Sequence, residues 1–412
     1  MQNKILLLIC SIIMNTAVFA QGVKWDIHTL FDGQIYPSYS WAVAYIGNEG
    51  LNEEGNVYGD QTGQLGVILE GLKKGQEIKI EIAENDIMES SILEFKIADL
   101  KVDALIANPQ ILYKWNELEN WRQPKPINLK ISVSVNGKLT RTDSRRIIVR
   151  SINDCPFAMA LSDMVFDFNY VYLSYVNENH PLITDVILPE IMKDGVIKNI
   201  SGYQDGTKES IYKQVYAVWQ YFNKKEFYYS SLENKYKMDG FPIIWSQHVR
   251  TFSDIYKTKQ ANCVEGTVLM ASILTRMGIN SYLATTPNHC FLGFALDKDG
   301  QEIAFLETTL LGNSVEELSE TVRESLSTVK LTGSDKYYRL TFGKNSYDMF
   351  LYALMNGISN FNNDADKFRD QNAEPYLTLN ENMGVGQAFQ ILNYRLLSVD
   401  YYRKRGLIPI NL

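Results

Sequence analysis

The chain carries, in this order, a thiol, an imidazole and a carboxylate that together could perform nucleophilic catalysis: Cys263, His289 and Glu307. A thiol attacks a carbonyl carbon well when a neighbouring base takes its proton and a third group orients that base. Asp297 also follows the histidine and is the reserve candidate for the orienting acid. A single histidine is more often structural than catalytic, so the chemistry depends on the elements that hold these side chains.

The segment around Cys263 is typical of a helix start. Asn262 can cap the helix, and Glu265 can reach back to the backbone N–H of Asn262, as in a capping box. We therefore expect Cys263 at the first helical position of an apolar, buried helix that ends at Gly278. Free N–H groups and the helix dipole favour a thiolate at that position. The alternative is a buried structural cysteine.

Three strands are expected after this helix, at residues 279–285, 289–296 and 301–308. His289 opens the second of these strands, and Glu307 closes the third. A hairpin between the second and third strands could therefore bring the two side chains together at one end of a sheet.

The register of this hairpin decides whether His289 and Glu307 meet, because a one-residue slip moves a side chain to the other face. A three-residue loop, 298–300, with Gly300 in the left-handed conformation places Glu307 opposite Phe291. Phe291 and His289 share a face, so Glu307 then lies diagonal to His289 and within its reach. A two-residue turn puts Glu307 on the wrong face, so the prediction requires the longer loop or a bulge.

The rest of the C-terminal part mixes helices and strands. Apolar residues of 211–222 fall on one helical face, and 241–250 is extended. Residues 347–358 and 385–402 are expected to be helical. The segment 359–379, rich in Asn and Asp, is expected to be a long loop.

Residues 21–150 have the pattern of an all-β domain. Apolar and polar residues alternate, and Asn136-Gly137 is typical of a tight hairpin turn. The expected strands are 41–46, 65–72, 78–82, 92–97, 127–135 and 147–149. Short strands of this kind predict an immunoglobulin-like β-sandwich, which we expect to be a structural or binding accessory domain.

Residues 1–20 have the pattern of a cleaved secretory signal. Lys4 precedes an apolar run too short to cross a bilayer, and Val18 and Ala20 suit a signal peptidase. The mature chain is expected to begin near Gln21 and to be exported to the periplasm or the extracellular space. No other segment is long and apolar enough for a membrane span.

The charge and the cysteines of the chain exclude several classes of protein. The formal net charge is -8 and basic clusters are lacking, which argues against nucleic acid and anionic membranes as partners. Beyond the signal the chain keeps Cys155, Cys263 and Cys290, too few for a disulfide framework. No calcium loop is recognisable, and we expect neither a metal nor an organic cofactor.

From Gln247 to about Thr309 the chain resembles the transglutaminase-like superfamily, whose core is a papain-like thiol site. The resembling elements are Gln247-His248-Val249-Arg250, Ala261 to Thr267, Ala271 to Leu274, Met277-Gly278-Ile279, Pro287 to Leu292, Leu306-Glu307-Thr308-Thr309 and the tail Tyr402 to Pro409. At three places another residue is commoner in the family: Gly for Ala261, Gly-His-Ala for Asn288-His289-Cys290, and Asp for Glu307.

The resemblance implies a papain-like α+β domain at residues 155–412, with its core at 241–310, and a role for each matched residue. Cys263 would be the nucleophile and His289 its base. Glu307 would orient His289. Gln247 would help the backbone N–H of Cys263 to stabilise the oxyanion.

By the same resemblance, the protein is expected to be an exported enzyme that acts on amide bonds of a protein or peptide through a Cys263 thioester. Water as the acceptor makes it a peptidase or amidase, and an amine makes it a transglutaminase. Bacterial members of the superfamily are more often hydrolytic. The alternative is a catalytically inactive binding or scaffold protein that keeps the fold.

Overall fold

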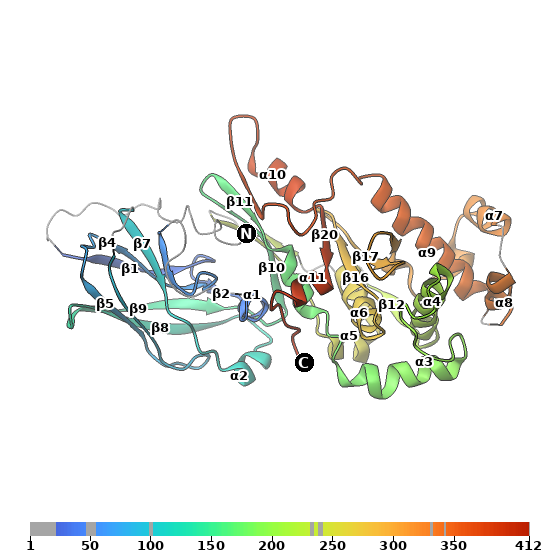
Figure 1. Cartoon of the computed structure of the whole chain (residues 1–412), viewed down its shortest axis with the longest axis horizontal. Coiled ribbons are helices and arrows are strands. Elements are labelled where there is room, and N and C mark those ends of the chain that lie inside the picture. Colours follow the sequence, from blue (N-terminus) through green and yellow to red (C-terminus); the bar gives the residue numbers. More distant parts are fainter. Residues whose placement is uncertain are drawn as a thin grey trace.

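The computed structural model describes residues 22–46, 55–98, 102–230, 235–237, 242–329, 333–341 and 343–411. The predicted signal sequence lies outside these residues. The fold is mixed α+β and has two large hydrophobic cores, which lie side by side in Figure 1. Two sheets in blue and cyan enclose the first core, and the green to red part of the chain builds most of the second.

The first region consists almost entirely of strands. They are β1 (Lys24–Thr29), β2 (Gln34–Ile35), β3 (Val57–Gly59), β4 (Leu65–Glu70), β5 (Glu77–Ile82), β6 (Ser91–Lys96), β7 (Ala104–Asn108), β8 (Lys125–Val135) and β9 (Lys138–Val149), and a short helix α2 (Trp115–Glu119) precedes β8. One sheet has the order β1-β4-β7-β3 and the other the order β2-β9-β8-β5-β6. Apolar residues of both sheets share one core, so the two sheets pack face to face.

Alternation along the strands produces this packing. In β5 the side chains of Ile78, Ile80 and Ile82 are buried, and the charged residues between them point away from the core. The strands predicted at 65–72, 78–82, 92–97 and 127–135 are confirmed within one or two residues. The strand predicted at 147–149 is only the end of β9, which begins at Lys138. Asn136 and Gly137 have φ values of 49° and 73°, as the predicted tight turn between β8 and β9 requires.

The segment 41–46, predicted as a strand, is instead the end of a helix (41–43) followed by a turn (44–46). Helix α1 (Pro37–Val43) begins with a proline, whose fixed φ suits the first turn, and every residue of the helix is buried. Because residues 37–43 are buried on all sides, they show no apolar period, so the sequence could not separate strand from helix there. Trp41 Nε1 donates to the backbone oxygen of Pro409 (2.8 Å), and α1 packs into the second core.

The second region contains two further sheets. Its strands are β10 (Asp154–Leu161), β11 (Met164–Asp167), β12 (Tyr228–Tyr229), β13 (Lys235–Lys237), β14 (Ile243–His248), β15 (Gln260–Ala261), β16 (Ser281–Thr285), β17 (Cys290–Ala295), β18 (Ile303–Leu306), β19 (Tyr376–Thr378) and β20 (Arg395–Ser398). One sheet has the order β13-β14-β10-β11-β19 and the other the order β18-β17-β16-β20, while β12 pairs with β15 alone.

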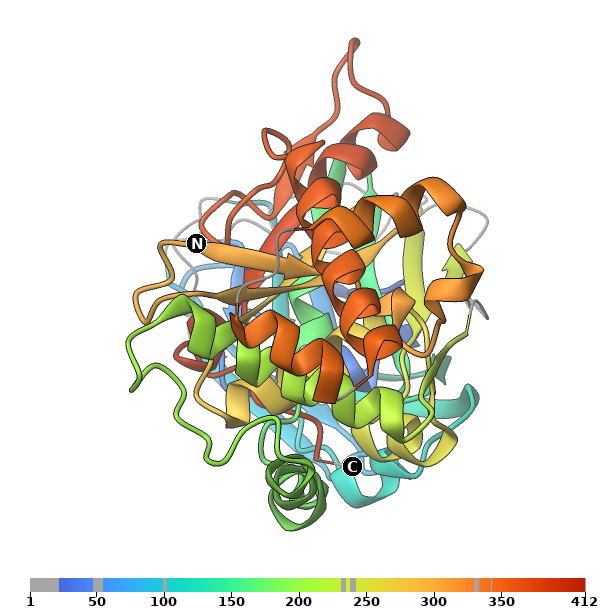
Figure 2. The ribbon, with the colours of Figure 1, turned by 90° about the vertical axis from the view of Figure 1, so that its right-hand side faces the viewer.

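Helices cover these sheets. They are α3 (Leu188–Asp194), α4 (Lys208–Lys224), α5 (Phe252–Thr258), α6 (Cys263–Arg276), α7 (Glu320–Thr328), α8 (Gly333–Thr341), α9 (Lys344–Asn362), α10 (Val385–Leu392) and α11 (Val399–Arg403), with short helical segments η2 (Asn169–Tyr175), η3 (Ile183–Ile187), η4 (Thr308–Leu310) and η5 (Val315–Glu317). Helix α6 packs against β16 and β17. Figure 2 looks onto the two longest helices, α4 and α9, with the strands behind them. No helix in the described ranges is long and apolar enough to cross a membrane.

Two C-terminal predictions need correction. The segment 385–402 is not one helix, because β20 lies between α10 and α11 and pairs with β16. The predicted loop 359–379 contains the end of α9 and the strand β19, which pairs with β11. In both cases a partner strand distant in sequence determines the local structure. The apolar face predicted at 211–222 lies in α4 and is buried.

Candidate active site

Helix α6 begins as the sequence predicts. The backbone N–H of Glu265 donates to Oδ1 of Asn262 (3.0 Å), and the backbone N–H of Asn262 donates to Oε2 of Glu265 (3.0 Å). This capping box places Cys263 at the first helical position, and the helix is followed by Gly278 with a φ of 80°. The cap uses the N–H of Glu265, and the N–H groups of Cys263 and Val264, before it in the first turn, have no intrahelical acceptor and point toward the space beside Cys263.

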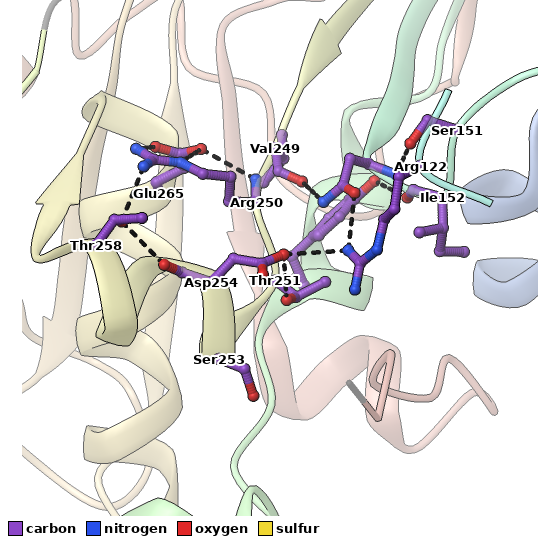
Figure 3. A network of polar contacts seen from close by, with 12 residues as sticks. Arg122, Ser151, Ile152, Val249, Arg250, Thr251, Ser253, Asp254, Thr258 and Glu265 are labelled. Carbon is purple, nitrogen blue, oxygen red and sulfur yellow. Dashed lines mark hydrogen bonds and ion pairs between the residues drawn. The ribbon is translucent and has the colours of Figure 1, made fainter. Parts of the chain in front are cut away.

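Glu265 also binds Arg250, as Figure 3 shows. Its Oε1 accepts from the backbone N–H (3.0 Å) and Nε (2.9 Å) of Arg250, and its Oε2 accepts from Nη2 (2.6 Å). The Glu265 side chain is almost fully buried, so the ion pair satisfies its charge. Because Arg250 follows β14 closely, this contact sets the position of β14 relative to the start of α6.

The same network continues to the first region. Arg122, which follows α2, donates from Nη1 to Oδ2 of Asp254 (3.1 Å) and to Oδ1 of Asn153 (3.0 Å). Asp254 Oδ2 also accepts from the hydroxyl of Thr251 (2.9 Å). Figure 3 shows this side of the network, which tethers the β-sheet region to the segment that leads into α6.

The hairpin has the register that the His289–Glu307 contact requires. Ala295 pairs with Ile303 and Leu292 with Leu306, and Gly300 in the loop has a φ of 69°. The next position in this register places Glu307 opposite Phe291, as the sequence predicts. His289 Nε2 donates to Oε2 of Glu307 at 2.6 Å, so the diagonal contact forms.

Glu307 accepts hydrogen bonds at both carboxylate oxygens. Oε1 accepts from the backbone N–H (3.0 Å) and the hydroxyl (2.7 Å) of Thr309. Oε2 accepts from His289 and from Nδ2 of Asn360 (2.9 Å). Burial raises the pKa of Glu307, but the hydrogen bond and charge of His289 and the bonds from Thr309 outweigh it, so the pKa is lowered. Glu307 is therefore ionised at neutral pH.

His289 lies between this carboxylate and Cys263. Burial acts to lower the pKa of His289, but hydrogen bonds with Cys263 and Glu307, together with their charges, raise it to about 10. Nε2 is bound to Glu307, so Nδ1 is the nitrogen that can take the proton of the thiol. His289 thus binds Glu307 on one side and lines one cavity with Cys263 on the other.

Gln247 presents a free donor to the same place. It is 1% exposed, and its Oε1 accepts from the hydroxyl of Tyr172 (3.2 Å). Burial raises the pKa of Tyr172 well above its usual value, so the hydroxyl keeps its proton and donates. This bond orients the amide so that Nε2 faces away from Tyr172, and Nε2 has no hydrogen-bond partner among the described residues. An unpartnered buried N–H beside a nucleophile is suited to an oxyanion.

A narrow cavity joins these groups. Its walls are formed by residues of β10, η2, β14, α6, the β16–β17 turn and the end of α10: Phe157, Asn169, Tyr172, Gln247, Cys263, Val264, Thr285, Thr286, Pro287, His289, Cys290 and Asn393. The space inside is about 10 Å³, close to what one water molecule requires. Cys263 is 2% exposed, so a substrate carbonyl can reach the sulfur only after some of these side chains move.

The other candidates of the sequence lie outside the contact between His289 and Glu307. Asp297, the reserve acid, is used by the hairpin loop: its carboxylate accepts from the backbone N–H groups of Asp299 (3.0 Å), Gln301 (3.0 Å) and Glu302 (2.8 Å). Cys290 is buried and also lines the cavity.

The cysteines and the acidic residues offer little other chemistry. In the part of the chain that the structure describes, Cys155, Cys263 and Cys290 form no disulfide. Burial raises the pKa of the Cys155 thiol well above its usual value, so that thiol is kept protonated. The described residues also contain no group of three or more His, Cys, Asp or Glu side chains that could hold a metal ion.

Three residues that hold the side chains of the site in place were not predicted from the sequence. Arg250 was part of a matched segment, but its partner Glu265 could not be known. Tyr172 lies far upstream in η2, in a stretch that carried no motif. Asn360 lies in the segment predicted as a loop. Polar residues aimed at a site from another element show no periodicity, so a single sequence contains no signal for them.

Comparisons with known proteins found no match. No family model, no curated protein and no solved structure matches the chain. The resemblance to the transglutaminase-like superfamily therefore depends on the residues and the geometry of this chain alone.

Proposed function

We propose that the protein is a thiol-dependent enzyme that acts on amide bonds of a protein or peptide, with a transglutaminase-like domain at residues 155–412. The observation that carries the proposal is the place of His289: its Nε2 binds Glu307, and it lines one cavity with Cys263 and with Gln247, whose Nε2 is unpartnered. The N-terminal sheets would be an immunoglobulin-like accessory domain, and the predicted signal implies export to the periplasm or the extracellular space.

In the first half of the reaction, His289 holds the proton of Cys263 and the sulfur attacks the amide carbonyl carbon. A C–S bond forms and the carbonyl π electrons move to oxygen. The backbone N–H of Cys263 and Nε2 of Gln247 stabilise this oxyanion, and such a donor is worth roughly 3 kcal/mol. When the oxyanion collapses, the C–N bond breaks, and His289 gives its proton to the leaving amine. The product is a thioester on Cys263.

In the second half, His289 takes a proton from the acceptor, which attacks the thioester carbon. Water as the acceptor releases a carboxylic acid and makes the enzyme a peptidase or amidase. An amine releases a new amide and makes it a transglutaminase. In each case the C–S bond breaks and the proton returns to the Cys263–His289 pair. Glu307 stays ionised throughout and stabilises the charged His289. We favour water, as the resemblance implies.

Alkylation by iodoacetamide tests the proposal without a known substrate. A thiolate paired with imidazolium reacts far below pH 8.5, the usual pKa of a free thiol, where a free thiol is almost entirely protonated. Peptide mapping would follow Cys263, with Cys155 as the internal reference in the same molecule. We expect Cys263 to react at pH 5.5 and His289→Ala to slow this reaction by about a hundredfold or more. The same pH profile in wild type and His289→Ala would contradict the proposal.

One observation supports the second candidate, a catalytically inactive binding or scaffold protein. The Cys263 sulfur is almost covered and the cavity beside it holds about one water. A scaffold would bind its partner equally well as Cys263→Ala and would not form a thioester with it. Trapping an acyl-enzyme on Cys263 by mass spectrometry, from a mixture of peptides, excludes this candidate.

A further inference from the structure

Helix α9 makes unusually close contact with the strand that leads to Glu307. The backbone N–H of Glu307 donates to the backbone oxygen of Ala353 (3.0 Å), which lies in α9. Four residues further on, a Cβ at Gly357 would lie 2.6 Å from backbone atoms of Phe305 and Leu306. A side chain at that position would push the helix and the strand apart, so the glycine permits the close approach.

Asn360 lies on the same face of α9 as Ala353 and Gly357, because positions i, i+4 and i+7 are aligned along a helix. Its Nδ2 donates to Oε2 of Glu307 at 2.9 Å, and this is the oxygen that accepts from His289. The packing of α9 against the strand thus places the amide of Asn360 beside the contact between Glu307 and His289. The segment is distant in sequence from the Cys263, His289 and Glu307 motifs.

We propose that Asn360 is a positioning residue for the Glu307–His289 pair, an inference that rests on the proposed function. Thr309 holds Oε1, and the carboxylate could still turn about that anchor. Asn360 holds Oε2 and so fixes the carboxylate plane, which keeps the acceptor in line with Nε2 of His289. Asn360 acts through Glu307 and does not itself line the cavity at Cys263.

The type of side chain is part of the inference. A neutral amide donates a hydrogen bond without neutralising the carboxylate, so the full negative charge of Glu307 remains for imidazolium at His289. A lysine or arginine at this position would compete with His289 for that charge. A leucine would keep the volume and lose the donor.

The experiment compares Asn360→Leu and Asn360→Asp with a matched control, Asn356→Leu. Asn356 lies one turn earlier in α9, and its Nδ2 donates to the backbone oxygen of Tyr352 in its own helix. Two readouts are taken on the full chain: the rate of Cys263 alkylation against pH, and the pKa of His289 from NMR titration of its ring. Circular dichroism checks that each variant is folded.

We expect Asn360→Leu to lower the alkylation rate of Cys263 at pH 6 by about tenfold, and to lower the pKa of His289 by up to about one pH unit, the shift that corresponds to such a change. Asn356→Leu should change neither. In Asn360→Asp, the alkylation rate of Cys263 should approach the wild-type rate only at low pH, where the new carboxyl group keeps a proton and can donate it to Glu307. At higher pH two carboxylates repel each other at this distance.

The outcomes separate this inference from the proposed function. If wild-type Cys263 does not react below the usual thiol range, the proposed function fails, whatever Asn360 does. If wild type reacts and Asn360→Leu matches it, the positioning role is overturned and the function stands. If Asn356→Leu lowers the alkylation rate of Cys263 as much as Asn360→Leu does, the role of Asn360 is structural only and the inference is overturned. The same holds if Asn360→Asp lowers that rate equally at all pH values.

Discussion

Each of the two regions of the molecule contains a histidine that is shielded from solvent to a different degree, and the two have opposite protonation states. His28 in β1 is 4% exposed, its pKa is lowered to about 4 by burial, and its Nε2 has no hydrogen-bond partner among the described residues. The side chain of His289 is partly buried, with 31% of it exposed, and Glu307 and Cys263 raise its pKa to about 10. At neutral pH the first is an uncharged core residue and the second carries a proton that chemistry can use.

The contrast shows that burial alone does not make a site. Desolvation disfavours the charged form of both histidines, and only a charged partner reverses this effect. The ion pairs differ in the same way. Glu265 and Arg250 form a nearly buried pair at the start of α6, whereas Asp26 and Arg145 pair across the surface of the sheets at 2.5 Å. Four changes would sharpen or break this comparison.

The largest effect on stability is expected from Glu265→Gln. The substitution leaves Arg250 half-buried without its charge partner and weakens the cap of α6. Breaking a buried pair by removing one partner costs roughly 3–5 kcal/mol. Urea denaturation should show a lower free energy of unfolding by an amount of this order. A loss below about 1 kcal/mol would mean that the pair behaves like a surface contact.

The next effect concerns alkaline pH. The pKa of His289 is raised above its usual value of about 6.5, so its contribution to stability is fully present below pH 6.5 and is lost as pH rises towards 10. The free energy of unfolding should fall by at most about 1.4 kcal/mol per pH unit in this range. Glu307→Gln should flatten the slope between pH 6.5 and 8.5 in urea titrations. Identical slopes in the two proteins would refute the role of this charge pair.

His28 should lower the stability of the protein at acidic pH, whereas His289 lowers it at alkaline pH. The pKa of His28 is lowered to about 4, so between pH 6.5 and 4 the unfolded chain binds a proton that the folded chain does not. Stability should therefore fall as pH decreases through this range. His28→Gln removes the titrating group and should reduce the acid slope, by no more than about 1.4 kcal/mol per pH unit. Thermal melts of wild type and His28→Gln at pH 7, 6 and 5 measure this dependence of stability on pH. The same slope in both proteins would contradict the prediction.

The smallest effect is expected from Asp26→Asn. Both partners of the Asp26–Arg145 pair are about two-fifths exposed, so solvent screens their attraction. We expect a change of less than about 1 kcal/mol in the free energy of unfolding, reduced further by salt. Urea denaturation at low and high salt provides the check. A loss as large as that of Glu265→Gln would remove the distinction between the two regions.

Much of the local structure could be predicted because it depends on neighbouring residues. The capping box at Asn262 and Glu265 involves residues three apart, and the three-residue loop with Gly300 in the left-handed conformation, one of the two loops that the sequence allowed, sets the hairpin register. That register is enough to bring Glu307 to His289. Strand positions in the first region follow from alternation along each strand. The strand predicted at 41–46 was wrong because residues 41–43 belong to a helix that is buried on all sides and shows no apolar period.

The sequence by itself determined the order of Cys263, His289 and Glu307, the helix start that presents the thiol, and the hairpin that joins base and acid. Tertiary structure alone decided what surrounds them: Tyr172 orients Gln247, Arg250 anchors Glu265, and α9 delivers Asn360 to Glu307. The reason is physical. Caps, turns and registers are set by contacts over a few residues, whereas these polar contacts join elements whose relative position arises only when the core packs.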